Sequence, residues 1–127
     1  MINIDDLVGV RYRTNGRSIQ GGFDCYGLAI EVEKRFGHNL PDLDEIKMKN
    51  RDINSCEELC VKQTKAIQID YPKTEGDVLF MKDGAGVMNH IGVYLGDGRF
   101  IHCNKYGVHI EKVAFYKNMI GRVYTWQ

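Results

Sequence analysis

Hydrophobic residues in the first half of the chain recur at helical spacing. Intervals of three and four residues, followed by Gly37, predict a helix over about residues 25–36. Asp24 stands directly before this helix, in the position where an N-cap is expected. The apolar stripe of the helix consists of Leu28, Ala29, Val32 and Phe36.

Two further helices are expected in the same half of the chain. Residues 3–8 fit a short helix, and Ser55 with Glu58 fits a capping box that would open a helix over about residues 55–66. The stretch 38–53 between the longer helices is polar and is expected to run over the surface.

Beyond Pro72 the pattern changes to β-strands separated by glycine-rich turns. A short helical stretch is also expected around residues 113–118. Helices followed by hairpin-linked strands predict one domain, residues 1–127, of the α+β class, with an antiparallel sheet of about five strands. The expected strands cover residues 78–82, 90–95, 99–103, 108–112 and 120–126.

Charge and hydrophobicity argue against several classes of protein. Lys plus Arg and Asp plus Glu each number 17, so the formal net charge is zero, which argues against a nucleic-acid partner. The sequence contains no run of about 18 apolar residues, so insertion into a membrane is not expected. The first ten residues include two aspartates and do not fit a signal peptide, so we expect a protein that is cytoplasmic when made.

One of the four cysteines stands apart from the others. Reduced thiols are expected, and the ligand spacing of zinc modules is missing, so no metal is expected. Cys56 and Cys60 lie one helical turn apart, which favours small buried hydrophobic side chains. Cys25 instead opens a helix, where unpaired backbone N–H groups and the helix dipole favour a reactive thiolate.

A thiolate nucleophile needs a base, and the base needs a group that orients it. His90 and His102 are the candidates because they lie on two strands that a single turn connects. His38 follows the helix stop in a polar loop, and His109 alternates with apolar residues on a short strand, so both are expected to face solvent.

The hairpin turn decides whether the two candidate histidines meet. A three-residue loop at 96–98 would pair Leu95 with Arg99 and place His90 and His102 on one face, about 7 Å apart at Cβ. A two-residue loop would place them on opposite faces. The three-residue register is favoured because it also gathers the aliphatic residues of both strands on the other face.

Three segments, in order along the chain, resemble the signatures of the NlpC-type cell-wall cysteine peptidases. They are GGFDCYGL at 21–28, GDVLF at 76–80 and HIGVYLGDGRFIH at 90–102, within a resemblance that extends over residues 9–126. The resemblance implies a reduced papain-like fold, in which the nucleophile helix packs on the sheet. It also implies hydrolysis of amide bonds in peptidoglycan peptides, often between γ-D-glutamyl and diaminopimelate or lysine, without a cofactor.

The resemblance also assigns roles to individual residues. Cys25 resembles the nucleophile, His90 the general base and His102 the group that orients the base. The backbone N–H of Cys25 would then serve as an oxyanion donor. The residues implied to position the substrate are Tyr12, Asp24 and Tyr26.

Tyr26 departs from the family pattern, because many members carry a serine there that helps to recognise a free peptide amine. In this respect the chain resembles members encoded with phage tail genes, which implies phage tail proteins as partners and as the carrier to the cell wall. Two alternatives stay open. One is a structural or binding module of a phage tail with little catalysis, and the other is an acyltransferase or amidase of the same fold with another substrate.

Overall fold

A computed structural model describes residues 2–42 and 53–126 and confirms the predicted α+β class. None of the helices in these ranges is long and apolar enough to cross a membrane. In chain order the elements are β1 (Arg17–Ser18), β2 (Gly22–Phe23), α1 (Cys25–Arg35), α2 (Ile53–Thr64), β3 (Ile67–Ile69), β4 (Val78–Lys82), β5 (Met88–Gly96), β6 (Arg99–Asn104), β7 (Gly107–Lys112), the 3₁₀ helix η2 (Val113–Met119) and β8 (Ile120–Thr125).

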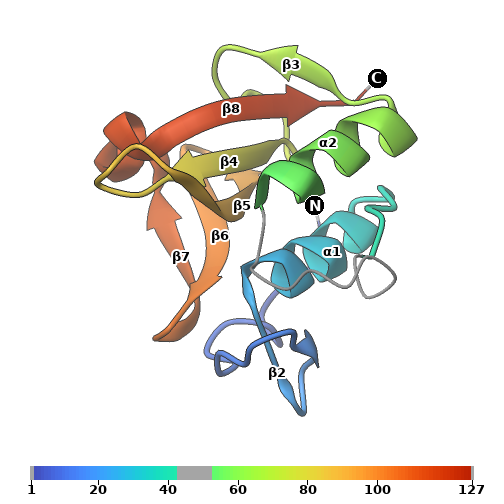
Figure 1. Cartoon of the computed structure of the whole chain (residues 1–127). Helices are drawn as coiled ribbons and strands as arrows, with labels where there is room; N and C mark the ends of the chain where they lie inside the picture. The colour runs from blue at the N-terminus through green and yellow to red at the C-terminus, as the bar shows by residue number, and fades with distance from the viewer. Residues whose placement is uncertain (1, 43–52, 127) are drawn as a thin grey trace.

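The main sheet has six antiparallel strands in the order β3-β8-β4-β5-β6-β7 (Figure 1). Five of them were predicted. The sixth, β3, is a three-residue strand that pairs with β8 at the edge of the sheet. Its three residues are partly or fully exposed, so their hydrophobic pattern carries little signal for a strand. Strands β1 and β2 form a separate small hairpin that was not predicted.

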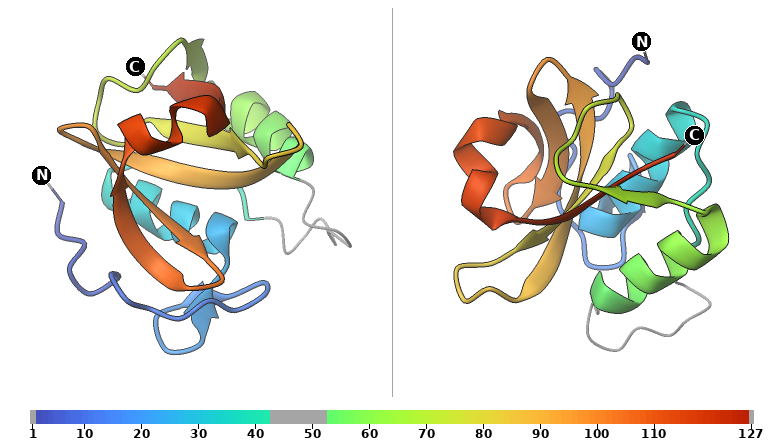
Figure 2. Two further views of the ribbon diagram at one scale, coloured as in Figure 1. Left: turned by 90° about the vertical axis from the view of Figure 1, so that its left-hand side faces the viewer. Right: turned by 90° about the horizontal axis from the view of Figure 1, so that it is seen from above.

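Both faces of the sheet are covered. Helices α1 and α2 lie on one face and η2 on the other, as the view from above shows (Figure 2). Alternate residues of each strand therefore enter two different cores. The sheet residues on the helical side include Val78, Phe80, Ile91, Val93, Ile101 and Cys103, whereas those on the η2 side include Leu79, Met81, Tyr94, Phe100 and Val123.

Both predicted boundaries of α1 are confirmed to within a residue. Asp24 is the N-cap, with extended backbone angles, and its Oδ1 accepts a hydrogen bond from Gly27 N at 2.6 Å. At the other end Gly37 has a φ of 90°, and its N–H and that of the next residue donate to carbonyls of the last turn. The Asp24 cap fixes Cys25 as the first residue of the helix.

Two helix predictions were wrong in detail. Residues 5–9 form turns, and no helix begins there. Helix α2 begins at Ile53, so Ser55 lies inside the helix and cannot be its N-cap. The polar stretch predicted at 38–53 falls largely outside the described residues.

The turn between β5 and β6 differs from the prediction, yet the predicted histidine register is correct. The loop has two residues, 97–98, and both have positive φ, 53° and 74°. Leu95 does not pair with Arg99 but is the extra residue of a β-bulge. The bulge shifts the register by one residue, and His102 therefore lies opposite Gly92 as expected.

Candidate active site

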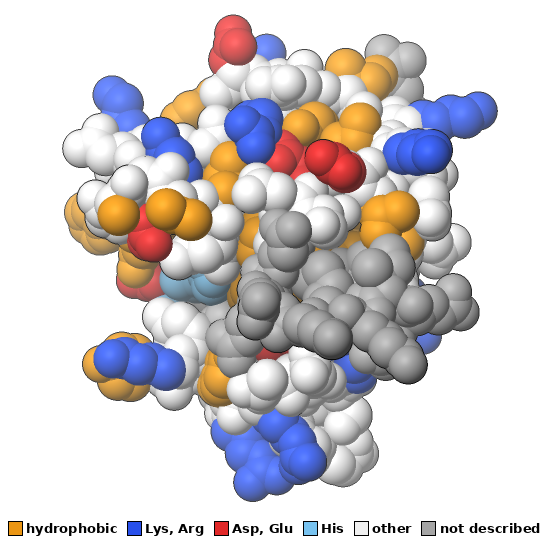
Figure 3. Space-filling model, viewed as in Figure 1, with side chains coloured by type: hydrophobic (Ala, Val, Ile, Leu, Met, Phe, Trp, Pro, Cys, Tyr) orange, Lys and Arg blue, Asp and Glu red, His pale blue; other side chains and the backbone are white. Residues whose placement is uncertain are grey.

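A pocket of about 490 Å³ brings together the predicted nucleophile and the two predicted histidines. Cys25, partly exposed at the first position of α1, lines it together with His90 from β5 and His102 from β6. Tyr12 lines the same pocket. In Figure 3 a pale-blue histidine patch reaches the surface on the left, beside acidic and hydrophobic atoms.

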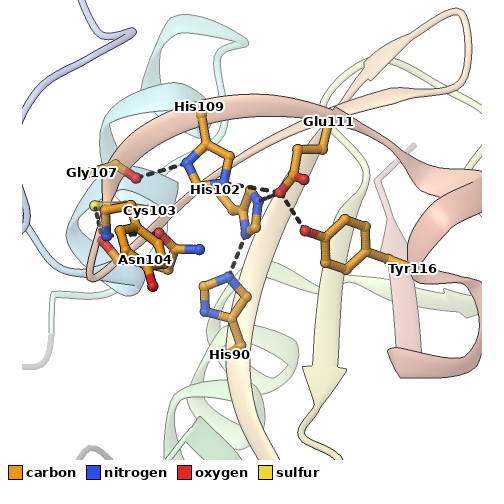
Figure 4. A network of polar contacts seen from close by, with 9 residues as sticks. His90, His102, Cys103, Asn104, Gly107, His109, Glu111 and Tyr116 are labelled. Carbon is orange, nitrogen blue, oxygen red and sulfur yellow. Dashed lines mark hydrogen bonds and ion pairs between the residues drawn. The ribbon is translucent and has the colours of Figure 1, made fainter.

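The two histidines contact each other directly. His90 Nε2 lies 2.7 Å from His102 Nδ1, and the two rings meet edge to face with centroids 5.0 Å apart (Figure 4). Gly92, opposite His102, has no side chain, and an added Cβ would lie 2.8 Å from the Phe100 ring beside His102. A larger residue at this position would therefore displace the aromatic packing that supports His102.

The far nitrogen of His102 leads to a carboxylate that sequence reasoning missed. His102 Nε2 lies 2.5 Å from Glu111 Oε2, and His109 Nε2 lies 2.9 Å from the same oxygen. Tyr116 donates its hydroxyl to that oxygen as well, at 2.6 Å. Figure 4 shows these side chains converging from β6, β7 and η2.

Burial lowers the pKa of both pocket histidines. The pKa of His90 falls to about 3, first through burial and then through the neighbouring His102 and His109. Burial also lowers the pKa of His102, although its hydrogen bond to Glu111 acts in the opposite direction. Both imidazoles are therefore neutral near pH 7.

The pKa of Glu111 moves in the other direction from that of a typical buried acid. Burial by itself raises the pKa of this carboxyl, but the hydrogen bonds from Tyr116 and His102 outweigh burial and bring the pKa below its ordinary value. Glu111 is therefore ionised near pH 7, when it accepts these hydrogen bonds most strongly.

Asp24 and Tyr26 do not line the pocket of Cys25. Asp24 is buried, and its Oδ1 is engaged by Gly27 N and by the guanidinium of Arg17 at 2.9 Å. Tyr26 is also buried, and its hydroxyl donates to Pro41 O at 2.6 Å. These contacts stabilise the start of the helix. Of the three residues predicted to position the substrate, only Tyr12 lines the pocket.

The two histidines that were expected to face solvent are both engaged. His109 is half-buried, with its side chain 32% exposed, and contacts Glu111 and the carbonyl of Gly107. His38 is 26% exposed; it contacts Glu33 Oε1 at 2.9 Å and stacks on Trp126. Cys56 and Cys60 are fully buried, as predicted.

A metal ion would compete with the hydrogen bonds at Glu111. Within the described ranges, His102, His109 and Glu111 offer ligand atoms that all lie within 4.8 Å of one another. Two imidazoles and a carboxylate suit a zinc-like ion. Such an ion would take the His102 nitrogen that now contacts Glu111, and the expectation of no metal stays a prediction.

Comparisons of sequence agree with the motifs. The chain is 33% identical over 108 residues to the gamma-D-glutamyl-L-lysine dipeptidyl-peptidase of Bacillus subtilis, which covers 83% of this chain and 31% of that protein. It is 31% identical over 118 residues to the murein DD-endopeptidase MepH of Escherichia coli, which covers 93% of this chain and 40% of that protein. The chain thus spans about a third of the length of these curated relatives.

Comparisons of structure agree with the fold. An NlpC/P60 family protein from Bacillus cereus superposes with a TM-score of 0.65 at 23% identity, over 94% of this chain and 36% of that one. NlpC2 from Trichomonas vaginalis gives 0.67 at 19% identity, over 97% and 44%. Residues 9–125 match the NlpC/P60 family, whose domains have the papain-like fold predicted above. The chain therefore belongs to the NlpC/P60 family.

Proposed function

We propose that this chain is a cysteine hydrolase that cleaves amide bonds in peptidoglycan stem peptides, such as the bond between γ-D-glutamyl and diaminopimelate or lysine. The observation that carries the proposal is one pocket lined by Cys25, at a helix start, and by the hydrogen-bonded pair His90 and His102. The names of the Bacillus subtilis and Escherichia coli relatives support this class of substrate.

Acylation would use the nitrogen of His90 that is not in contact with His102. His90 Nε2 faces His102, so Nδ1 is available to take the proton from the Cys25 thiol as Sγ attacks the scissile carbonyl carbon. The carbonyl oxygen gains negative charge, and backbone N–H groups at the start of α1 stabilise it. Collapse of the tetrahedral intermediate breaks the C–N bond, and His90 gives its proton to the leaving amine.

Deacylation would repeat these roles with water. His90 takes a proton from the water as its oxygen attacks the thioester carbon, and the C–S bond then breaks. The proton returns to Cys25 Sγ, and the products are a carboxylic acid and an amine. His102 touches no reacting atom in this scheme and acts by holding His90.

The test is incubation of the purified chain with defined muropeptides, beside Cys25→Ala, with the products identified by mass spectrometry. We expect cleavage next to D-glutamate by the wild type and none by the variant. Cys103→Ala is a matched control, because Cys103 borders the same pocket but is fully buried, and burial raises the pKa of its thiol to about 11. Activity of Cys25→Ala equal to that of the wild type would contradict the proposal.

We further propose that the domain acts at the cell wall after delivery by a carrier, for which a phage tail stays the predicted candidate.

The rate at which iodoacetamide alkylates Cys25 distinguishes the two alternative functions, an enzyme with another substrate and a structural or binding module. Fast alkylation without cleavage of any stem peptide would favour an acyltransferase or an amidase with another substrate. Slow alkylation without cleavage would favour a structural or binding module.

A further inference from the structure

We propose that Glu111 is a positioning residue that determines which ring nitrogens of His102 and His90 carry protons. This inference rests on the proposed function, in which His90 is the base for Cys25. Glu111 does not line the pocket of Cys25 and so acts only through the two histidines.

The positions of the ring protons follow from the contacts that link Glu111 to His102 and His102 to His90. An ionised carboxylate only accepts hydrogen bonds, so His102 Nε2 must donate to Glu111. A neutral His102 then has a lone pair on Nδ1, and His90 Nε2 must donate to it. A neutral His90 is left with its lone pair on Nδ1, the nitrogen that the mechanism requires as base.

The ionised carboxylate accepts hydrogen bonds from Tyr116 and His102, and three groups contact Glu111 Oε2 in all. They are His102 on β6, His109 on β7 and Tyr116 on η2. The sheet register explains the convergence, because His102 pairs with His109 and Phe100 with Glu111, which places all four side chains on one face. Glu111 on β7 thus contacts His102 from behind the pocket, and Tyr116 on η2, which itself lines the pocket, donates to the same carboxylate.

Loss of the carboxylate charge would release both tautomers. His102 could then carry its proton on Nδ1 and donate to His90 Nε2. His90 would hold its own proton on Nδ1 and could not accept one from Cys25. The expected defect is therefore a wrong tautomer in a folded protein, with every reacting group still present.

The first measurement compares Glu111→Gln with Glu57→Gln in the full chain. Glu57 is a matched control, because it also accepts a tyrosine hydroxyl at 2.6 Å, from Tyr124, but lies outside the pocket of Cys25. We expect kcat/KM on the muropeptide to fall roughly 10–100-fold in Glu111→Gln and to stay within about twofold of wild type in Glu57→Gln. Thermal unfolding reports whether each variant is folded.

The second measurement reports the tautomers without any substrate. Long-range ¹H–¹⁵N NMR spectra of the imidazole rings should show Nε2–H on both His90 and His102 in the wild type, and a population with Nδ1–H in Glu111→Gln. The alkylation rate of Cys25 near pH 7 should fall in the same variant. Both readouts remain valid if the wild type cleaves no stem peptide, so failure of the proposed function is distinguishable from failure of this inference.

Tyr116→Phe provides a milder variant in case Glu111→Gln does not fold. The Tyr116 hydroxyl donates to Glu111 Oε2, the oxygen that His102 Nε2 contacts, so its loss loosens the carboxylate beside His102. The ring spectra should then show a smaller population with Nδ1–H than in Glu111→Gln, and the alkylation of Cys25 should slow less. Wild-type ring spectra and wild-type alkylation in Glu111→Gln, or in folded Tyr116→Phe where Glu111→Gln does not fold, would overturn the inference.

Discussion

Two glutamates of this protein each contact a histidine, and the two pairs show opposite electrostatics. Glu111 is 28% exposed, and three side chains contact its Oε2. Glu33 is fully buried; His38 contacts its Oε1, and its Oε2 has no hydrogen-bond partner among the described residues. Burial raises the pKa of Glu33 to about 7 against the opposing effect of His38, whereas the pKa of Glu111 is lowered.

The difference follows from burial and from the number of hydrogen bonds together, because Glu33 is fully buried with one contact, whereas the partly exposed Glu111 accepts from Tyr116 and His102. Glu111 keeps its charge near pH 7 and can fix the protons of His102. Glu33 titrates near pH 7, and neither it nor His38 borders the pocket of Cys25. The same two residue types therefore border the pocket of Cys25 in one pair, through His102, and lie away from it in the other.

The largest expected effect is a difference in activity between His102→Ala and His38→Ala. Loss of His102 leaves His90 without the group that orients it, and we expect kcat/KM to fall roughly 10²–10⁴-fold. His38→Ala removes a contact to Glu33 and a ring stacked on Trp126, so it should lower the melting temperature and keep kcat/KM within about twofold. Steady-state kinetics and thermal unfolding of the two variants check both parts. Equal losses of activity in two folded variants would remove the contrast.

The second effect concerns the pH dependence of stability and depends on Glu33. Its pKa is about 7 in the folded protein and near the ordinary value of 4.5 in the unfolded chain. Between these values the folded protein binds more protons, so this residue makes the free energy of unfolding fall as pH rises from about 4.5 to 7. The loss amounts to about 3 kcal/mol and is complete above pH 7.

Glu33→Gln does not titrate and should abolish that loss. The measurement is urea unfolding of wild type and variant from pH 4.5 to 8, with the difference between their free energies plotted against pH. Glu58→Gln on the exposed side of α2 is the control for a glutamate substitution without burial. A difference that does not change with pH would show that Glu33 has an ordinary pKa in the folded state.

Local patterns in the sequence were sufficient to predict α1, most of the sheet and the meeting of His90 with His102. The helix has a capping aspartate, a hydrophobic stripe and a terminal glycine, and each signal is local. The turn between β5 and β6 was predicted with the wrong length, because a bulge at Leu95 cannot be distinguished from a longer loop by apolar alternation alone. The aliphatic pattern of both strands still selected the correct register.

Glu111 was missed for a reason that can be stated in the same terms. The hairpin between β6 and β7 pairs Asn104 with Gly107, and this register places His109 opposite His102. Side-chain alternation along β7 from that turn onward would have placed Glu111 on the same face as His102. Alternation with Val108 and Ile110 instead suggested solvent for this face, because nothing local reveals that η2 folds back over it.

The smallest expected effect comes from comparing Trp126→Phe with Tyr116→Phe. Each variant deletes one hydrogen-bond donor beside one of the two Glu–His pairs. Trp126 donates Nε1–H to Thr64 at 2.9 Å, and its ring stacks on His38 with centroids 4.3 Å apart. Phenylalanine keeps a ring and loses the hydrogen bond, so we expect a loss of about 1 kcal/mol in the free energy of unfolding. The alkylation rate of Cys25 should not change, since Trp126 contacts the pair that lies outside the pocket of Cys25. A fall in that rate as large as in Tyr116→Phe would mean that the two Glu–His pairs are coupled through the sheet.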